Sequence, residues 1–262
     1  MQGVLRNREV AQLRALVIPD TQAAPGRTTK HLYALSKYIA DKRFDLIVHI
    51  GDLGDFPSLS SYDKGKAAFE GRRVTKDWDS FQEAVDAIES AWKGKKYSPR
   101  LVYTEGNHEH RIKRAENDDP KLVGTLPDTC GYMRDRGWEA YPFLTVAKVE
   151  GVLFSHLLPR TLTGRVTNTS IRYGANSASH QVRANMASCV AGHRPGVDIA
   201  MVRGPKHMLT GVIAGSFYPW KETYNGPHGD ENWRGCVVLN RLRGGQYDPC
   251  LVGLPFLMER YT

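Results

Sequence analysis

The stretch Leu101-Val102-Tyr103-Thr104-Glu105-Gly106-Asn107-His108-Glu109 joins an apolar run to a group of polar side chains. The apolar part has the length and composition of a buried strand. An amide, an imidazole and a carboxylate follow it at once, and these side chains bind metals or transfer protons. Because open α/β sheets form their sites at the carboxyl ends of strands, the stretch predicts a functional site at the end of a strand.

Four further groups of this kind occur in the chain. Pro19-Asp20-Thr21-Gln22 and Gly51-Asp52-Leu53-Gly54-Asp55 precede the first stretch, and Ser155-His156 and Ala191-Gly192-His193 follow it. Each group comes after a short apolar run. A single Asp after a strand is typical of a turn or a helix cap, but five such groups indicate one shared site.

The order of these groups resembles the calcineurin-like metallophosphoesterase superfamily over roughly residues 15 to 215. The family pattern is D-x-H, GDxxD, GNH followed by Glu or Asp, a lone His, and GHxH. The chain departs from the pattern at Gln22, where the family has His, and at Pro195, which stands in place of the last His. The Asp-Thr-Gln opening also resembles phage-encoded members.

The resemblance implies an α/β fold, a four-layer αββα sandwich of two mixed sheets flanked by helices, in a single metallophosphoesterase domain over residues 1–262. Loop or cap insertions are expected at 56–74 and 157–187. The residue pattern predicts parallel strands and alternating helices in the first half, and antiparallel hairpins in the second. The predicted strands are near 14–18, 46–50, 101–104, 143–149, 151–155, 188–192, 197–202, 207–214, 235–241 and 250–255, and the predicted helices are near 30–42, 75–93, 110–117 and 176–187.

The resemblance also implies a site for two divalent metal ions. Its ligands would be Asp20, Gln22, Asp52, Asn107, His156 and His193, with Asp52 shared by both ions. The second-metal site is complete, whereas the first-metal site has lost two imidazoles and is richer in oxygen. Mn²⁺ suits such a site best, with Fe, Zn²⁺, Ni²⁺ or Mg²⁺ as alternatives. Three histidines are candidates for the missing metal ligand: His110, His180 and His207. Arg194 could instead place a fixed positive charge near the position that the missing ligand would occupy.

In the family the His of GNH is not a metal ligand. By resemblance, His108 donates a proton to the leaving oxygen or binds the phosphoryl group, and Asp55 orients its ring. The side chains expected to contact the substrate are Arg72, Arg73, Arg160 and Arg194.

The function that follows is a metal-dependent hydrolase of phosphoesters that uses a metal-bound hydroxide. The net charge of +8 favours anionic substrates. Aromatic and basic residues mix in the loop 56–74, which favours a phosphodiesterase acting on nucleotides or nucleic acids. The alternatives are a phosphomonoesterase and a non-catalytic scaffold that binds phosphate or nucleic acid. The sequence indicates no oligomeric state.

Composition sets the remaining expectations. No apolar run reaches the ~18 residues of a membrane span, and the first residues do not resemble a signal peptide, so a cytoplasmic protein without a membrane partner is expected. The four cysteines form no C-x-x-C pair and are expected to be reduced and mostly buried. His31 is expected on the surface of the first helix, and His49 in the core.

Overall fold

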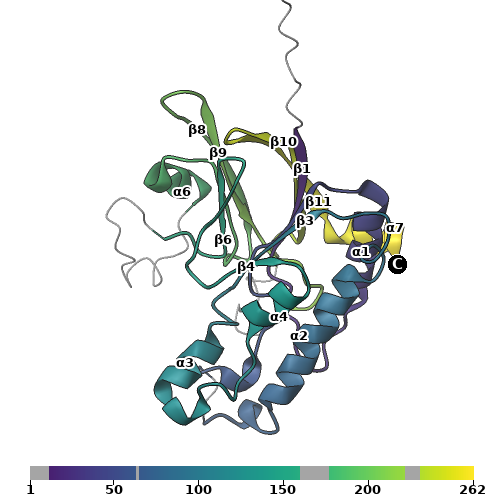
Figure 1. The fold of residues 1–262 in the computed structure, drawn as a ribbon, viewed down its shortest axis with the longest axis vertical. Coiled ribbons are helices and arrows are strands. Elements are labelled where there is room, and N and C mark those ends of the chain that lie inside the picture. The colour runs from purple at the N-terminus through teal and green to yellow at the C-terminus, as the bar shows by residue number, and fades with distance from the viewer. Residues whose placement is uncertain (1–11, 63–64, 160–176, 222–230) are drawn as a thin grey trace, which may run out of the picture.

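The computed structural model describes residues 12–62, 65–159, 177–221 and 231–262 and shows two β-sheets packed face to face (Figure 1). The first sheet has the order β11-β10-β1-β2-β3-β4. Its strands are β1 (Leu13–Ile18), β2 (Leu46–His49), β3 (Arg100–Thr104), β4 (Glu139–Tyr141), β10 (Gly235–Arg243) and β11 (Gln246–Gly253). The four strands β1 to β4 run parallel, as expected for the first half of the chain.

The second sheet has the order β5-β6-β7-β9-β8. Its strands are β5 (Ala147–Val149), β6 (Val152–Ser155), β7 (Cys189–Ala191), β8 (Val197–Arg203) and β9 (Met208–Ala214). The expectation of antiparallel hairpins in the second half is confirmed for β5–β6, β8–β9 and β10–β11. It is wrong for β6, β7 and β9, which are mutually parallel. The chain crosses between β6 and β7 through a segment that contains a helix, and β8 returns it to the starting end before β9.

Helices cover the outer face of each sheet and complete a four-layer αββα sandwich, which confirms the predicted fold class (Figure 1). α1 (Lys30–Lys42), α2 (Val74–Glu89), α4 (Thr129–Asp135) and α7 (Leu254–Tyr261) contribute to the core on the first sheet. α6 (Ala178–Asn185) covers the second sheet, and α3 (Arg111–Asp118) follows β3. None of the helices in the described part of the chain is long and apolar enough to span a membrane.

The strand β1 shows why its sequence is apolar throughout. Leu16 and Ile18 belong to the core between the first sheet and its helices, whereas Ala15 and Val17 belong to the core between the two sheets. A strand that is buried on both faces needs a continuous apolar run rather than an alternating one. The same packing holds the carboxyl end of β1 rigidly at the edge where the polar groups follow.

Three elements differ from the predictions. Residues 254–261 form α7 rather than the end of a strand, and Pro255 stands in its first turn, where proline fits a helix. The sequence did not predict β4 or α4. The predicted insertion at 56–74 contains two short 3-10 turns, Pro57–Leu59 and Ala67–Phe69, while residues 63–64 in it and residues 160–176 of the second insertion lie outside the described part.

Candidate metal centre

The five polar groups lie together at one edge of the two sheets. Asp20, Asp52 and Asn107 follow the parallel strands β1, β2 and β3 of the first sheet. His156 and His193 follow β6 and β7, which are parallel neighbours in the second sheet. Close contacts between the two sets show that the strand ends of both sheets meet at one place.

Two glycines let the loops after β2 and β3 pack against each other. A Cβ atom on Gly106 would lie 2.1 Å from Asp52 Oδ1. Gly51 has a φ of +93°, which favours glycine, and a Cβ atom there would lie 2.7 Å from His156 Cβ. A side chain at either position would therefore displace Asp52 or His156.

The buried carboxylate of Glu109 joins the same two loops. Its Oε1 accepts a hydrogen bond from the backbone N–H of Gly54 at 2.9 Å. Its Oε2 accepts from the N–H groups of Asp52 at 3.1 Å and Gly106 at 2.9 Å. Three backbone donors on one carboxylate hold the main chain that carries Asp52, so the acidic residue after His108 supports the loop rather than the reaction.

Four ligand-type atoms converge, one each from Asp52, Asn107, His156 and His193. Asn107 Oδ1 lies 2.9 Å from His156 Nε2 and 2.7 Å from His193 Nδ1. His156 Nε2 also lies 3.3 Å from Asp52 Oδ2. Ligands about 2.1 Å from a metal and at right angles to one another are about 3 Å apart. Asp52, His156 and His193 place one ligand atom each within 4.8 Å of the others, so these residues fit around one metal ion.

The backbone fixes which nitrogen of His156 carries a proton. Nδ1 lies 3.0 Å from the carbonyl oxygen of Ile50, which only accepts, so Nδ1–H donates. In the neutral ring, the Nε2 lone pair then faces the oxygens of Asn107 and Asp52. These lone pairs repel one another unless a cation lies between them. In the metal-free chain burial opposes a second proton, but the charges of Asp52 and Asp20 outweigh it and raise the pKa of His156 to about 9. A metal ion would take the place of that proton.

The pKa values of Asp52 and His193 favour the protonation states that bind a metal. Burial opposes the ionisation of Asp52, but His108 and His156 together hold its pKa well below the usual range. Burial and the neighbouring His156 lower the pKa of His193 to about 4. At neutral pH, Asp52 is therefore a carboxylate and His193 a neutral imidazole, as metal ligands must be.

His108 lies beside the four converging atoms and not among them. Its Nδ1 is 2.7 Å from Asp55 Oδ1, and its Nε2 is 3.7 Å from Asp52 Oδ2. Burial works against the charged ring, but Asp52 and the hydrogen bond to Asp55 outweigh it and raise the pKa of His108. This arrangement suits a side chain that holds a proton near the metal ligands.

Arg111 on α3 is a site residue that the sequence did not predict. Its Nη1 donates to the backbone oxygen of Asp55 at 2.6 Å and to Asp55 Oδ1 at 3.1 Å. Its Nη2 lies 3.2 Å from His108 Nε2, and the residue is 8% exposed. An Arg in the first turn of a helix is usually solvated. The available signal was its spacing, since Arg111 comes three residues after His108 and its N–H donates to His108 O at 3.1 Å in the turn that leads into α3.

The first-metal half of the site is less complete. Asp20 is buried, its Oδ1 has no hydrogen-bond partner within the described residues, and His156 Nδ1 is 3.7 Å away. Burial and the charge of Asp52 raise the pKa of Asp20 to about 7 against the opposing effect of His156. The backbone of Gln22 has a positive φ of 44° and donates to Asp52 O at 2.9 Å. An orphaned buried carboxylate fits a cation, but Pro195 adds no side-chain ligand.

The contacts of the three candidate replacement histidines lie elsewhere. His110 packs against the ring of Phe143 at 4.9 Å. His180 lies on α6, and His207 lies in the turn after β8, at the opposite end of that strand from His193. What completes the first half of the site therefore remains a prediction without an assigned residue.

The predicted substrate arginines have mixed positions. Arg194 is half-buried directly after His193. Arg72 Nη1 donates to Pro57 O at 3.0 Å, and Arg73 Nη1 donates to Arg72 O at 2.8 Å, so both contact the backbone of their own loop. Arg160 lies outside the described residues. Their roles in substrate binding stay predictions.

Other predictions are settled by burial. His31 is 1% exposed, so its expected place on the helix surface is wrong. His49 lies in the core, where its Nε2 is 3.2 Å from Thr21 Oγ1. All four cysteines are free, and Cys130, Cys189 and Cys236 are buried while Cys250 is exposed.

Comparison with known proteins gives a partial likeness to two phage proteins. The chain is 36% identical over 99 residues to the Gene 54 protein of Mycobacterium phage L5, which covers 37% of this chain and 36% of that protein. It is 36% identical over 98 residues to the Gene 54 protein of Mycobacterium phage D29, with the same coverage. The match thus spans about a third of each relative. No family model matches the chain.

Proposed function

We propose that the chain is a metal-dependent phosphodiesterase that acts on nucleotides or nucleic acids. The observation that carries the proposal is the convergence of Asp52, Asn107, His156 and His193, with His108 beside them. Two imidazoles, an amide oxygen and a carboxylate suit Mn²⁺, Fe or Zn²⁺ better than Ca²⁺, which prefers oxygen ligands alone. When bound, such an ion acts as a Lewis acid on a phosphoryl oxygen and lowers the pKa of water.

The side chains around the ligands have separate tasks. Asp55 accepts from Nδ1 of His108 and orients the ring, and Arg111 holds Asp55 in place. In the neutral ring His108 Nε2 accepts from Arg111 Nη2 at 3.2 Å. In the protonated ring Nε2–H faces the region of Asp52, where it transfers a proton to the leaving oxygen or binds the phosphoryl group. The net charge of +8 favours the approach of an anionic phosphoester to the protein.

A phosphate-binding scaffold without catalysis is the second candidate. It is favoured by one observation, the incomplete first-metal half: Pro195 offers no side-chain ligand, and Asp20 Oδ1 has no hydrogen-bond partner within the described residues. Against it stands the hydrogen-bonded group of His108, Asp55 and Arg111, because binding a metal alone requires none of these contacts. We therefore favour the enzyme, and favour diesters over monoesters on the charge and composition of the chain. The likeness to two phage proteins supports a phage origin.

The test is hydrolysis of bis(4-nitrophenyl) phosphate and of 4-nitrophenyl phosphate by the chelated chain, with Mn²⁺, Ni²⁺, Zn²⁺, Mg²⁺ or Ca²⁺ added back. We expect the diester to be hydrolysed faster than the monoester, and Mn²⁺ to restore turnover better than Ca²⁺. Full turnover after exhaustive chelation would overturn the metal dependence. Metal binding without turnover of either ester would favour the scaffold.

A further inference from the structure

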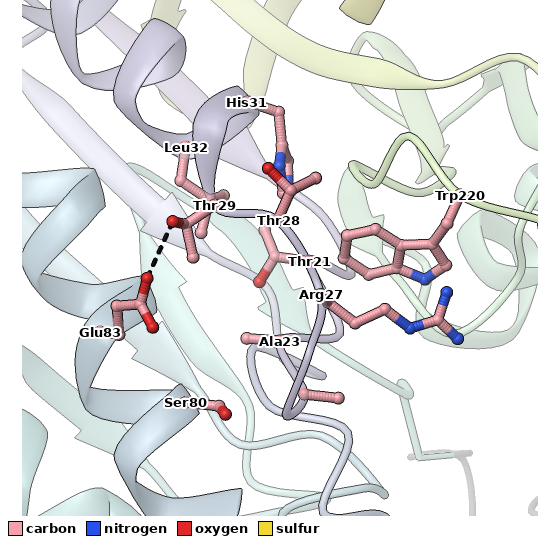
Figure 2. Close-up of a pocket in the computed structure, with 11 residues that line it drawn as sticks. Thr21, Ala23, Arg27, Thr28, Thr29, His31, Leu32, Ser80, Glu83 and Trp220 are labelled. Atoms are coloured by element: carbon pink, nitrogen blue, oxygen red, sulfur yellow. Dashed lines mark hydrogen bonds between the residues drawn. The ribbon is translucent and has the colours of Figure 1, made fainter.

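Thr21 stands between Asp20 and Gln22, the two ligands expected only on the first-metal side. It lies in the loop between β1 and α1, where this loop, α1 and α2 surround a small pocket (Figure 2). The N–H groups of Thr21 and Gln22 both donate to the carbonyl oxygen of Asp52, at 3.1 and 2.9 Å. The main chain that carries the first-metal ligands is therefore hydrogen-bonded to the loop that carries the shared carboxylate.

Both loops hold a backbone conformation that is uncommon outside glycine. Gln22 has a φ of 44° and Asp52 has a φ of 49°. A residue other than glycine rarely adopts a positive φ, and such a conformation persists only where neighbouring contacts hold it. Contacts next to Gln22 therefore decide where the first-metal ligands lie relative to Asp52.

The side chain of Thr21 makes such a contact. It is fully buried, and its Oγ1 lies 3.0 Å from the carbonyl oxygen of Leu53 and 3.2 Å from His49 Nε2. A carbonyl oxygen only accepts, so the hydroxyl donates to Leu53, and the hydroxyl oxygen is left to accept from His49 Nε2–H. Two hydrogen bonds thus connect the end of β2, the Thr21 side chain and the loop that follows β2.

His49 is an unusual residue for its place in the core. Like the rest of β2 it is fully buried, and its ring centre lies 6.2 Å from that of Tyr103. Burial lowers the pKa of His49 to about 3, so the ring is neutral, and its Nδ1 has no hydrogen-bond partner within the described residues. An unpartnered buried nitrogen destabilises a fold, so packing alone favours an apolar residue here. The hydrogen bond to Thr21 is what an apolar residue would lack.

We propose that Thr21 and His49 are positioning residues for the first-metal half of the site. Thr21 holds the main chain of Asp20 and Gln22 in place. His49 in turn keeps the Thr21 hydroxyl directed at Leu53. The side chain of Asp20 stays available to an ion, since its Oδ1 has no hydrogen-bond partner in the described part of the chain. The inference rests on the proposed function through its metal dependence alone and requires no particular substrate.

Mn²⁺ titration of the metal-stripped chain, with free Mn²⁺ measured by electron paramagnetic resonance, tests the role of Thr21 without turnover. The first-metal side should be the weaker of two sites, because it lacks imidazoles. Thr21→Val keeps the shape and removes the hydroxyl. We expect it to weaken the weak site about tenfold, as loss of a contact behind a ligand does, and to leave the tight site unchanged.

Two further variants separate the hydroxyl from the bulk of the side chain. Thr21→Ser keeps the hydroxyl and should restore most of the weak-site affinity. Thr104→Val is the matched control, because Thr104 is also buried and its Oγ1 has no partner among the described residues. This control should bind Mn²⁺ as the wild type does.

Three outcomes would overturn the proposal. The first is a weak site that is unchanged in Thr21→Val. The second is an equal loss at both sites, which would indicate general loosening of the fold. The third is a wild-type chain that binds only one Mn²⁺ ion. Binding at two sites without hydrolysis of any ester would instead overturn the proposed function and leave this inference standing.

His49→Leu tests whether the histidine acts through Thr21. The variant keeps a side chain of similar size and removes the donor, and we expect the weak site to be about threefold weaker, as for the loss of one neutral hydrogen bond. In the Thr21→Val background the same change should have no further effect on the weak site, because the acceptor is already gone. An equal loss in both backgrounds would overturn the positioning role of His49 and assign it to packing.

Discussion

The two halves of the candidate metal centre differ in how their polar atoms are matched. On the second-metal side, Asn107 Oδ1 meets a nitrogen of His156 and a nitrogen of His193 at 2.9 and 2.7 Å, and Asp52 accepts from the backbone N–H of His108 at 2.9 Å. On the first-metal side, Asp20 Oδ1 is buried without a hydrogen-bond partner in the described part of the chain.

This difference between the two half-sites shows which metal ligands the fold holds in place before an ion binds. Backbone contacts fix the second-metal side before any ion arrives, through Ile50 O on His156 and through Glu109 on the loop of Asp52. Such outer contacts orient ligands and increase metal affinity. The first-metal side has a carboxylate but lacks the imidazoles, so we expect one tight and one weak metal site.

The largest expected effect concerns His108, which serves the reaction without holding metal. His108→Ala should reduce kcat by about 10²- to 10⁴-fold, the range for loss of a general acid. Metal content should remain near that of the wild type, because Asp52, Asn107, His156 and His193 are unchanged. Kinetics with the diester and metal analysis of the purified variant provide the check, and a parallel loss of metal would assign His108 to the ligands instead.

A smaller effect is expected at Arg111, which holds Asp55 and touches His108. Arg111→Met keeps much of the buried length and removes the donors, and it should lower kcat by about 10- to 100-fold, as removal of an outer contact does. Arg114→Met on the exposed side of the same helix is the matched control. The pH profile of kcat should change in Arg111→Met alone. Equal profiles in the two variants would reduce Arg111 to a purely structural residue.

The stability of the metal-free chain should respond with opposite signs at the two aspartates. The folded-state pKa of Asp20 is raised to about 7, so this carboxyl destabilises the fold progressively between about pH 4 and pH 7, and in full above that. The pKa of Asp52 is depressed, so its carboxylate stabilises the fold above the unfolded pKa. At pH 8 with chelator, Asp20→Asn should raise the free energy of unfolding and Asp52→Asn should lower it, each by about 1–3 kcal/mol.

The Asp20 difference should shrink as the pH falls from about 7 toward the unfolded pKa of about 4, whereas the Asp52 difference should persist to about pH 4 and be lost only below it. Urea unfolding of the three chains at pH 8 and pH 4.5 measures them. Changes of the same sign at pH 8 would mean that the two carboxylates have similar environments, which would remove the contrast between the half-sites.

The smallest effect is expected from restoring one imidazole. Gln22→His should tighten the weak site about tenfold for Mn²⁺ or Zn²⁺, because imidazole binds transition metals better than a neutral amide. The tight site should keep its affinity. An unchanged weak site would show that residue 22 does not face the metal, and that the first motif is aligned wrongly.

The sequence was informative wherever a strand end carries its own signal. The apolar run of residues 14–18 and the polar group after it predicted β1 and the position of Asp20, and the same logic placed Asp52, Asn107, His156 and His193 at one edge. The sequence did not predict features that depend on packing between distant parts of the chain. His31 is buried because residues 217–220 fold over the start of α1, and no local pattern indicates that contact.

Arg111 shows the same limit within the site. Its spacing from His108 places the two within one turn at the start of α3, but its contact with Asp55 depends on how the loops after β2 and β3 pack. The parallel order of β6, β7 and β9 was also missed, although a helix was predicted near 176–187 between β6 and β7, because the other connections in this half are short and resemble those of hairpins. Pairing and burial are properties of the whole fold, whereas ligand identity is local.

The most direct test of the central claim is an equilibrium titration of the metal-stripped chain with Mn²⁺, with free Mn²⁺ measured by electron paramagnetic resonance. We expect one tight site and one weaker site in the wild type. His193→Ala and Asn107→Ala should each remove the tight site, whereas Asp20→Asn should affect mainly the weak one. A tight site that survives in both His193→Ala and Asn107→Ala would contradict the account.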